Sequence, residues 1–357
     1  MTGLERSAIG LLVLALIVLA IWWVGRDRVR YTGLIRVTAV LTFVLIVLGA
    51  FVRLSDAGLG CPDWPGCYGN LTPAHSLDDI RAAEAAQPGG PVSVAKAWKE
   101  MIHRYLAMLV GSLIAAITVA SIRNRQDWQQ GVVLPVVLSL AVVFQAALGA
   151  WTVTLLLKPA IVTAHLLGGV MLLGLLVWLW SRQPAAGPAA AAIISRPGLR
   201  AFAGVALLVV LVQITLGGWV STNYAALACA DLPKCHGAWM PAMDFANAFH
   251  VVRPLGVGPN GDLLTHEALT AIHWAHRVGA LLTLSVVGLF GMSLRRQAAS
   301  RGVAHTLLGL LVLQIVLGLL NVAWSLPLAV AVMHNGVAAL LFSFLLLINL
   351  RLAKGVA

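Results

Sequence analysis

The chain has 357 residues, of which 60% are hydrophobic and only 10% are charged. A soluble domain carries about 25% charged residues, so this composition cannot cover a surface that faces water. It excludes a soluble globular enzyme, a disordered chain and a nucleic-acid-binding protein. The formal net charge is +11. Its basic residues are concentrated in alternate segments between apolar runs, which indicates membrane topology instead of a polyanionic partner.

Nine apolar runs have the length of membrane-spanning helices, since crossing the hydrocarbon core takes about 20 apolar residues. They cover residues 8–25, 35–53, 101–121, 132–155, 162–181, 201–220, 270–292, 303–323 and 328–350. We therefore expect an all-α integral membrane protein that crosses the membrane nine times.

The charges between these runs predict the orientation. The segments 26–36, 122–131, 182–200, 294–302 and the tail from 351 hold 14 Lys or Arg and only two acids, whereas the alternate segments are rich in acids. Positive loops stay in the cytoplasm, so the N-terminus is expected outside and the C-terminus inside. The first run has no clear cleavage site and is interpreted as a retained helix. A bacterial cytoplasmic (inner) membrane is the expected location.

An internal repeat organises the chain. Cys61 and Cys67 correspond to Cys229 and Cys235 at an offset of 168 residues, and later motifs correspond in the same order. The repeat predicts two tandem, pseudo-symmetric four-helix bundles at 33–181 and 199–357, joined by a cytoplasmic linker at 182–198. Residues 1–32 form an extra N-terminal helix and loop outside the repeat.

Four histidines recur within the repeat. His103 matches His276, and His165 matches His334, each near the outer end of an inward-running helix. The second and fourth helices of a bundle are diagonal neighbours, and two opposed neutral imidazoles can ligate haem iron. We predict two bis-histidine haem sites, His103 with His165 and His276 with His334. The alternative for any single histidine is a hydrogen-bonded packing role.

Polar neighbours of these histidines are further candidates. Arg104 and Arg277 each follow a ligand candidate and either bind haem propionates or extend to the lipid headgroups. Glu100 lies one turn before His103, and its counterpart in the second half is His273. A desolvated carboxylate there could move protons or stabilise positive charge. The alternative is an interfacial carboxylate paired with Lys96 or Lys99.

All four cysteines lie in outer loops as two Cys-x5-Cys pairs. These loops face the oxidising side of the membrane, so disulfides Cys61–Cys67 and Cys229–Cys235 are the simplest expectation. A zinc site completed by His75 or His236 is the alternative, and we expect no metal other than haem iron.

In these motifs the chain resembles the haem A synthase family. The resemblance spans residues 33–351 and rests on five stretches in order: GAFVRL at 49–54 leading through GLGCPDWP at 58–65 to Cys67, Glu100-x-x-His103-Arg104, TAHL at 163–166, His273-x-x-His276-Arg277, and Met333-His334-Asn335. The family has eight helices, so the run at 8–25 is a departure.

The resemblance implies a membrane oxidoreductase that oxidises the C8 methyl group of haem O to the formyl group of haem A for terminal oxidases. His103 and His165 would then ligate the substrate haem, with Glu100 as the catalytic carboxylate. His276 and His334 would hold a haem b cofactor, and Cys61–Cys67 would be the functional disulfide. Expected partners are haem O, haem O synthase, cytochrome oxidase assembly factors, an unknown electron acceptor and further copies of the chain.

Two other functions remain open from the sequence. A dihaem b-type electron carrier or quinol oxidoreductase would use the same four histidines and leave its haem unmodified. A transporter built on parallel repeats would use His and Glu as a proton relay, but it should show broken helices and midplane polar residues.

Overall fold

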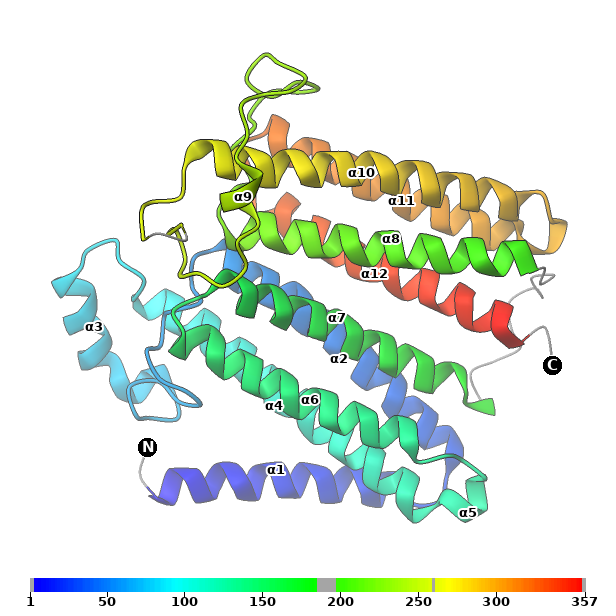
Figure 1. Ribbon diagram of the computed structural model, residues 1–357. Helices are drawn as coiled ribbons and strands as arrows, with labels where there is room; N and C mark the ends of the chain where they lie inside the picture. Colours follow the sequence, from blue (N-terminus) through cyan, green and yellow to red (C-terminus); the bar gives the residue numbers. More distant parts are fainter. Residues whose placement is uncertain (1–2, 185–196, 259–260, 355–357) are drawn as a thin grey trace. The chain divides into compact units, whose positions relative to one another are not determined.

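The computed structural model describes residues 3–184, 197–258 and 261–354. Within these ranges the chain is helical and has no β-strand beyond three isolated bridges in loops (Figure 1). The helices are α1 (Gly3–Val24), α2 (Arg28–Leu54), α3 (Leu77–Ala86), α4 (Val94–Arg123), α5 (Arg125–Trp128), α6 (Val133–Thr154), α7 (Pro159–Ser181), α8 (Pro197–Thr222), α9 (Phe245–Ala248), α10 (His266–Arg295), α11 (Arg301–Ala323) and α12 (Leu328–Lys354).

Eight of the described helices are long and apolar enough to cross a membrane, namely α2, α4, α6, α7, α8, α10, α11 and α12. The chain is thus a multi-pass membrane protein. The predicted ninth crossing is not confirmed: Gly10–Val24 of α1 is an apolar stretch shorter than the eight candidate spans. Most of the predicted linker at 182–198 lies outside the described residues.

Several helices begin well before the apolar run that predicted them. α2 begins at Arg28 because the Asp27 side chain accepts the N–H groups of Val29 and Arg30. Likewise, Ser93 caps α4 and Thr265 caps α10. Capping satisfies N–H groups that have no partner inside the helix. The polar first turns of α4 and α10 therefore belong to the helices that carry the candidate site residues.

The structure divides into two compact units: Met1–Leu157 with Gly168–Ala186, and Lys158–Leu167 with Gly187–Ala357. In unit 1, α4 packs against α1, α2 and α6. The C-terminal part of α7 completes the core, where Leu176 and Leu179 join Tyr31, Ile114 and Leu138 from the other helices. Burial of these apolar side chains holds unit 1 together.

In unit 2, α8 packs against α10, α10 against α11, α11 against α12, and α12 against α8 (Figure 1). The four helices therefore form a closed ring in which α10 and α12 are diagonal. Phe202 of α8 meets Phe290 of α10 edge to face, and Asn349 of α12 donates to the carbonyl of Ala203 on α8 at 3.0 Å. This ring places the helices of His276 and His334 opposite one another.

Candidate functional site

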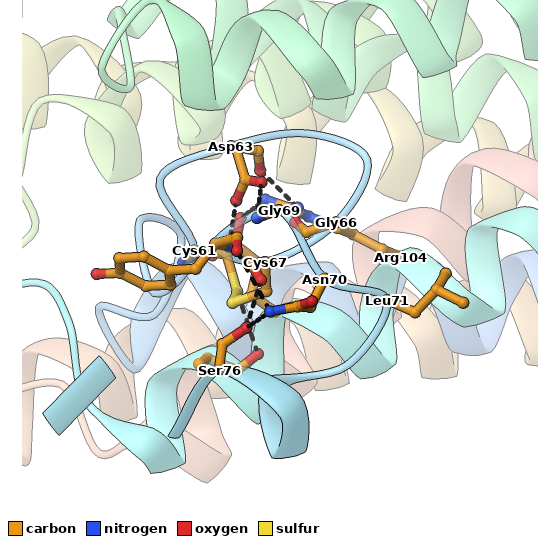
Figure 2. Close-up of a disulfide and its surroundings, with 12 residues drawn as sticks. Cys61, Asp63, Gly66, Cys67, Gly69, Asn70, Leu71, Ser76 and Arg104 are labelled. Atoms are coloured by element: carbon orange, nitrogen blue, oxygen red, sulfur yellow. Dashed lines mark hydrogen bonds and ion pairs between the residues drawn. A yellow bond between two sulfur atoms is a disulfide. The ribbon is translucent and has the colours of Figure 1, made fainter. Parts of the chain in front are cut away.

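The loop that follows α2 in unit 1 is a compact structure closed by a disulfide between Cys61 and Cys67 (Figure 2). The Asp63 carboxylate accepts the backbone N–H groups of Tyr68 and Gly69, both at 2.7 Å. Tyr68 and Gly69 have positive φ angles of 50° and 75°, a conformation that costs a non-glycine residue energy. Two charge-assisted hydrogen bonds offset that cost.

Arg104 on α4 anchors this loop, and its side chain reaches the loop beside Gly66 (Figure 2). Its Nη1 donates to the carbonyls of Asp63 at 2.7 Å and Gly66 at 2.5 Å, and its Nη2 donates to Glu100 Oε1 at 2.5 Å. Three of the five guanidinium N–H groups are used by these bonds. Arg104 therefore holds the loop against α4, whatever else it binds.

Glu100 connects the same helix to the disulfide. Only 5% of Glu100 is exposed; besides Arg104, its Oε2 accepts the backbone N–H of Cys61 at 2.9 Å. The lysine partners considered from the sequence are engaged elsewhere, since Lys96 pairs with Asp56 at 3.7 Å and Lys99 lies over the Phe51 ring at 5.1 Å. The carboxylate is thus a buried group within unit 1 that pairs with Arg104 and with neither lysine.

Unit 2 repeats the disulfide, the capping carboxylate and the two positive-φ residues of this loop. Cys229 and Cys235 form a disulfide, and the Asp231 carboxylate accepts the N–H groups of His236 at 2.8 Å and Gly237 at 2.9 Å. These bonds, that from Gly237 first, hold the pKa of the Asp231 carboxyl below its usual value. The cysteines that would bind zinc together with His236 are joined to one another, so they offer no thiolates.

Arg277 anchors the second loop as Arg104 anchors the first. Its Nη1 donates to the carbonyls of Asp231 and Lys234, both at 2.9 Å, and its Nη2 donates to the Cys229 carbonyl at 2.6 Å. The propionate-binding role predicted for Arg104 and Arg277 stays a prediction. The loop contacts show a structural role that sequence reasoning did not find.

The two units differ at the residue beside the disulfide. His273 takes the place of Glu100: its Nδ1 accepts the backbone N–H of Cys229 at 3.3 Å, and its Nε2 lies 3.2 Å from Arg277 Nε. Both residues therefore accept the first cysteine's N–H, but only unit 1 has a carboxylate at this position. The loop fold is shared, and the units differ chemically at the side chain beside the disulfide.

Three of the four candidate ligands pack over a glycine of a neighbouring helix. A Cβ atom added to Gly49 would lie 3.0 Å from the Cε1 atom of His103. The same construction gives 3.1 Å from Gly217 to His276 and 3.1 Å from Gly318 to His334. A hydrogen atom at these positions lets each imidazole approach the adjacent backbone, so any larger residue would push the ring away.

Two glutamines contact the imidazoles of unit 2. Gln213 Nε2 lies 3.1 Å from His276 Nδ1 and donates to the His276 carbonyl at 3.0 Å, and Gln314 Nε2 lies 3.2 Å from His334 Nε2. Gln314 has Gln145 as its counterpart in the first half, but neither Gln314 nor Gln213 was among the residues predicted from the sequence. The available signal was an amide within an apolar run, because such a group needs a partner there.

The structure supports a haem-binding donor set in unit 2. His276 and His334 lie on the diagonal helices α10 and α12. Each ring packs against a glycine of a neighbouring helix, and the buried Nδ1 of His334 has no hydrogen-bond partner in the described residues. Two neutral imidazoles on opposite helices are the donors that a six-coordinate haem iron takes, so these residues fit the group.

In the first half, the pairing of the ligands stays a prediction. His103 lies in unit 1, whereas His165 lies in the Lys158–Leu167 segment of unit 2. Within unit 2 this segment is held by the Thr163 hydroxyl, 3.2 Å from that of Thr222.

These features define a class: a helical multi-pass membrane protein with two copies of a disulfide-closed loop anchored on a helix that carries a histidine ligand candidate. A model of the COX15-CtaA family, described as cytochrome oxidase assembly protein, matches residues 32–346. The chain therefore belongs to this family. α1 precedes the matched region.

Similar curated proteins agree with this membership. The chain is 42% identical over 320 residues to Heme A synthase of Shewanella oneidensis, an alignment that covers 90% of this chain and 96% of that protein. It is 27% identical to Heme A synthase of Rhizorhabdus wittichii, covering 86% and 90% of the two chains. The identity to Heme A synthase of Halalkalibacterium halodurans is 26%, with coverage of 90% and 96%.

Proposed function

We infer that this protein is a haem A synthase, a membrane oxidoreductase that converts the C8 methyl group of haem O to the formyl group of haem A. The observation that carries this inference is the 42% identity to Heme A synthase of Shewanella oneidensis over 90% of the chain. The product serves terminal oxidases, in keeping with the description of the family as cytochrome oxidase assembly proteins.

We propose that His103 and His165 hold the substrate haem and that Glu100 is the catalytic carboxylate. The burial of Glu100 and its position one turn before His103 support this role. Oxidation of a methyl group on a conjugated ring removes electrons and protons and adds an oxygen atom. An anionic carboxylate held by Arg104 can stabilise the developing positive charge and accept a proton.

In the second half, His276 and His334 are proposed to hold haem b, which would supply one-electron transfer when bound. Gln213 would orient the imidazole, because its amide nitrogen lies 3.1 Å from Nδ1 of His276 and donates to the His276 carbonyl at 3.0 Å. The proposed propionate contacts of Arg104 and Arg277 would use the guanidinium N–H groups that do not bond to the loops.

The proposed topology keeps the predicted orientation, with the N-terminus outside and the C-terminus in the bacterial cytoplasm. α1 is proposed to cross the inner membrane as a ninth helix before the two four-helix bundles at 33–181 and 199–357. Proposed partners are haem O synthase, oxidase assembly factors, an electron acceptor and further copies of the chain. The bond pattern at Cys61, Glu100 and Arg104 supports a functional role for the first disulfide in particular.

Coexpression with a source of haem O, followed by pigment extraction and mass analysis, tests the function. The wild-type protein should yield haem A, and Glu100→Ala and His103→Ala should reduce it at least tenfold. Haem identical to the supplied haem O in every sample would favour the alternative, a dihaem electron carrier that does not modify haem. Normal haem A from Glu100→Ala alone would remove the catalytic assignment of that carboxylate.

A further inference from the structure

A cavity of about 280 Å³ lies in unit 1, at the end where the short helix α5 joins α4 to α6. It is formed by α6, the C-terminal part of α7 and the start of α2. None of the residues proposed to bind haem lines it. Its volume is near the lower limit of about 300 Å³ for small-molecule pockets, which suits a headgroup better than a whole lipid.

The lining of this cavity is cationic. Arg28 and Arg182 both contribute to it, and the described lining contains no Asp or Glu. Arg28 donates through Nη1 to the Trp128 carbonyl at 3.0 Å, while its buried Nε has no hydrogen-bond partner among the described residues. Two guanidinium groups without a neutralising acid favour an anionic ligand.

The N-terminus of α6 adds to this preference. Gly131, Val133 and Leu134 line the cavity, and Val132 at the N-cap provides no side-chain hydrogen bond. The first turn of α6 contains no acid either. The free N–H groups of a helix N-terminus and its dipole attract phosphate oxygens.

Two glutamines of the lining carry hydrogen-bond acceptors. Gln130 and Gln183 line the cavity, and the Oε1 atom of each is buried without a partner in the described structure. Only 4% of Gln183 is exposed. Leaving such an acceptor unsatisfied costs free energy, so the ligand should carry hydroxyl groups next to its anionic group.

The remaining wall is apolar and comes from α6 and α7, including Val137, Leu175 and Trp178. Both helices are candidate membrane spans, so their ends lie at the level of the lipid headgroups. A free phosphate would leave this wall without a ligand contact, whereas an acyl chain would cover it.

We propose that this cavity binds an anionic glycerophospholipid whose headgroup carries hydroxyl groups, as phosphatidylglycerol does. Arg28, Arg182 and the N-terminus of α6 bind the phosphodiester, and the headgroup hydroxyls donate to Gln130 and Gln183. One acyl chain lies along the apolar wall. Basic pockets between helices at the membrane surface recognise anionic lipids in this way.

Native mass spectrometry of the full-length protein, purified in detergent and mixed with defined lipids, tests the proposal. The wild-type protein should retain one phosphatidylglycerol and release phosphatidylcholine at least tenfold more readily. Arg28→Gln/Arg182→Gln should lose this selectivity. Arg182→Gln alone keeps the Arg28–Trp128 bond and should weaken retention severalfold, which separates ligand binding from folding.

Arg123→Gln/Arg125→Gln is the matched control, because it removes the same charge from exposed positions at the same end of the helices and outside the cavity. It should retain phosphatidylglycerol like the wild type. Equal retention by the wild type and both double variants would overturn the proposal. Displacement of the lipid by millimolar inorganic phosphate, or recovery of a quinone in its place, would overturn it too.

Discussion

The backbone N–H of Cys61 donates to Oε2 of Glu100 at 2.9 Å, so the proposed catalytic carboxylate also holds the first cysteine of the loop disulfide. In the second unit His273 accepts the corresponding N–H of Cys229. Reduction or oxidation of the first disulfide would therefore change the surroundings of a negative charge. The same change at the second disulfide would alter the surroundings of an imidazole.

Glu100→Gln separates the two roles of this side chain. The amide keeps an acceptor for the Cys61 N–H but removes the negative charge that faces the substrate in the proposed site. Haem A formation should fall at least tenfold, while the Cys61–Cys67 disulfide should resist reduction as in the wild type. Mass analysis of extracted pigment and alkylation of reduced cysteines measure the two effects. A loop that opens in parallel with the loss of activity would indicate a positioning role alone.

Arg104→Gln should release the first loop. The change removes charge-assisted hydrogen bonds to two loop carbonyls and to Glu100, each worth about 1.5–3 kcal/mol. The Cys61–Cys67 disulfide should then be reduced at least tenfold faster by a water-soluble reductant. Arg81→Gln on α3, an exposed position, should leave the rate unchanged. Equal rates for both variants would contradict the anchoring role of Arg104.

Gly217→Ala should disturb the second site through packing alone. Its new Cβ would lie 3.1 Å from His276 Cε1, so the imidazole must move by a few tenths of an ångström. We expect roughly tenfold weaker haem retention, measured as haem per protein after detergent exchange, as for other changes around metal ligands. Gly204→Ala on the same helix meets no atom within 4 Å and should retain haem normally. Full haem retention by both variants would contradict the proposed need for a glycine beside His276.

Gln213→Leu removes the amide next to His276 and fills a similar volume. If the amide orients the imidazole, haem affinity should fall about 10–100-fold, and the reduction potential of the second-half haem should shift. Spectroelectrochemical titration gives the potential, and haem transfer to an apoprotein gives the affinity. A neighbouring apolar substitution, Leu211→Ile, is the control. An unchanged potential and affinity in Gln213→Leu would remove the proposed role.

The loop of unit 2 should depend on pH through Asp231. Hydrogen bonds, chiefly from Gly237, depress the pKa of its carboxyl in the folded loop below the value of about 4 that it has when unfolded. Their stabilisation is complete above pH 4 and is lost as the pH falls through the folded pKa. Reduction of Cys229–Cys235 by a phosphine should accelerate below that range. Asp231→Asn should abolish this acceleration, and an identical pH profile would contradict the prediction.

The sequence was sufficient for the helical class, the repeat and the disulfide pairs, because apolar length and cysteine position are local properties. It misplaced the starts of α2, α4 and α10, since a single capping residue extends a helix past its apolar run. It also missed the anchoring of the loops by Arg104 and Arg277. Those bonds end on main-chain carbonyls that are distant in sequence. Every residue has such a carbonyl, so the residue types do not reveal which ones are bonded.

The environment of the histidines was predicted only in part. Their repetition indicated paired ligands, and the glycine repeats at 49 and 217 were visible in the alignment of the halves. Their role emerges only when neighbouring helices are in contact, because the missing side chain makes room for a residue distant in sequence. Gln213 has Leu45 as its counterpart at the same offset, so the repeat concealed a contact that belongs to one unit.

The most direct measurement is the identity of the porphyrin lost from each half. Protein coexpressed with a haem O source should be purified as wild type, His103→Ala and His276→Ala, and its pigments identified by mass. We predict that His103→Ala loses haem O and haem A but keeps haem b, and that His276→Ala loses haem b. Loss of the same porphyrin from both variants, or of none from either, would contradict two separate haem sites.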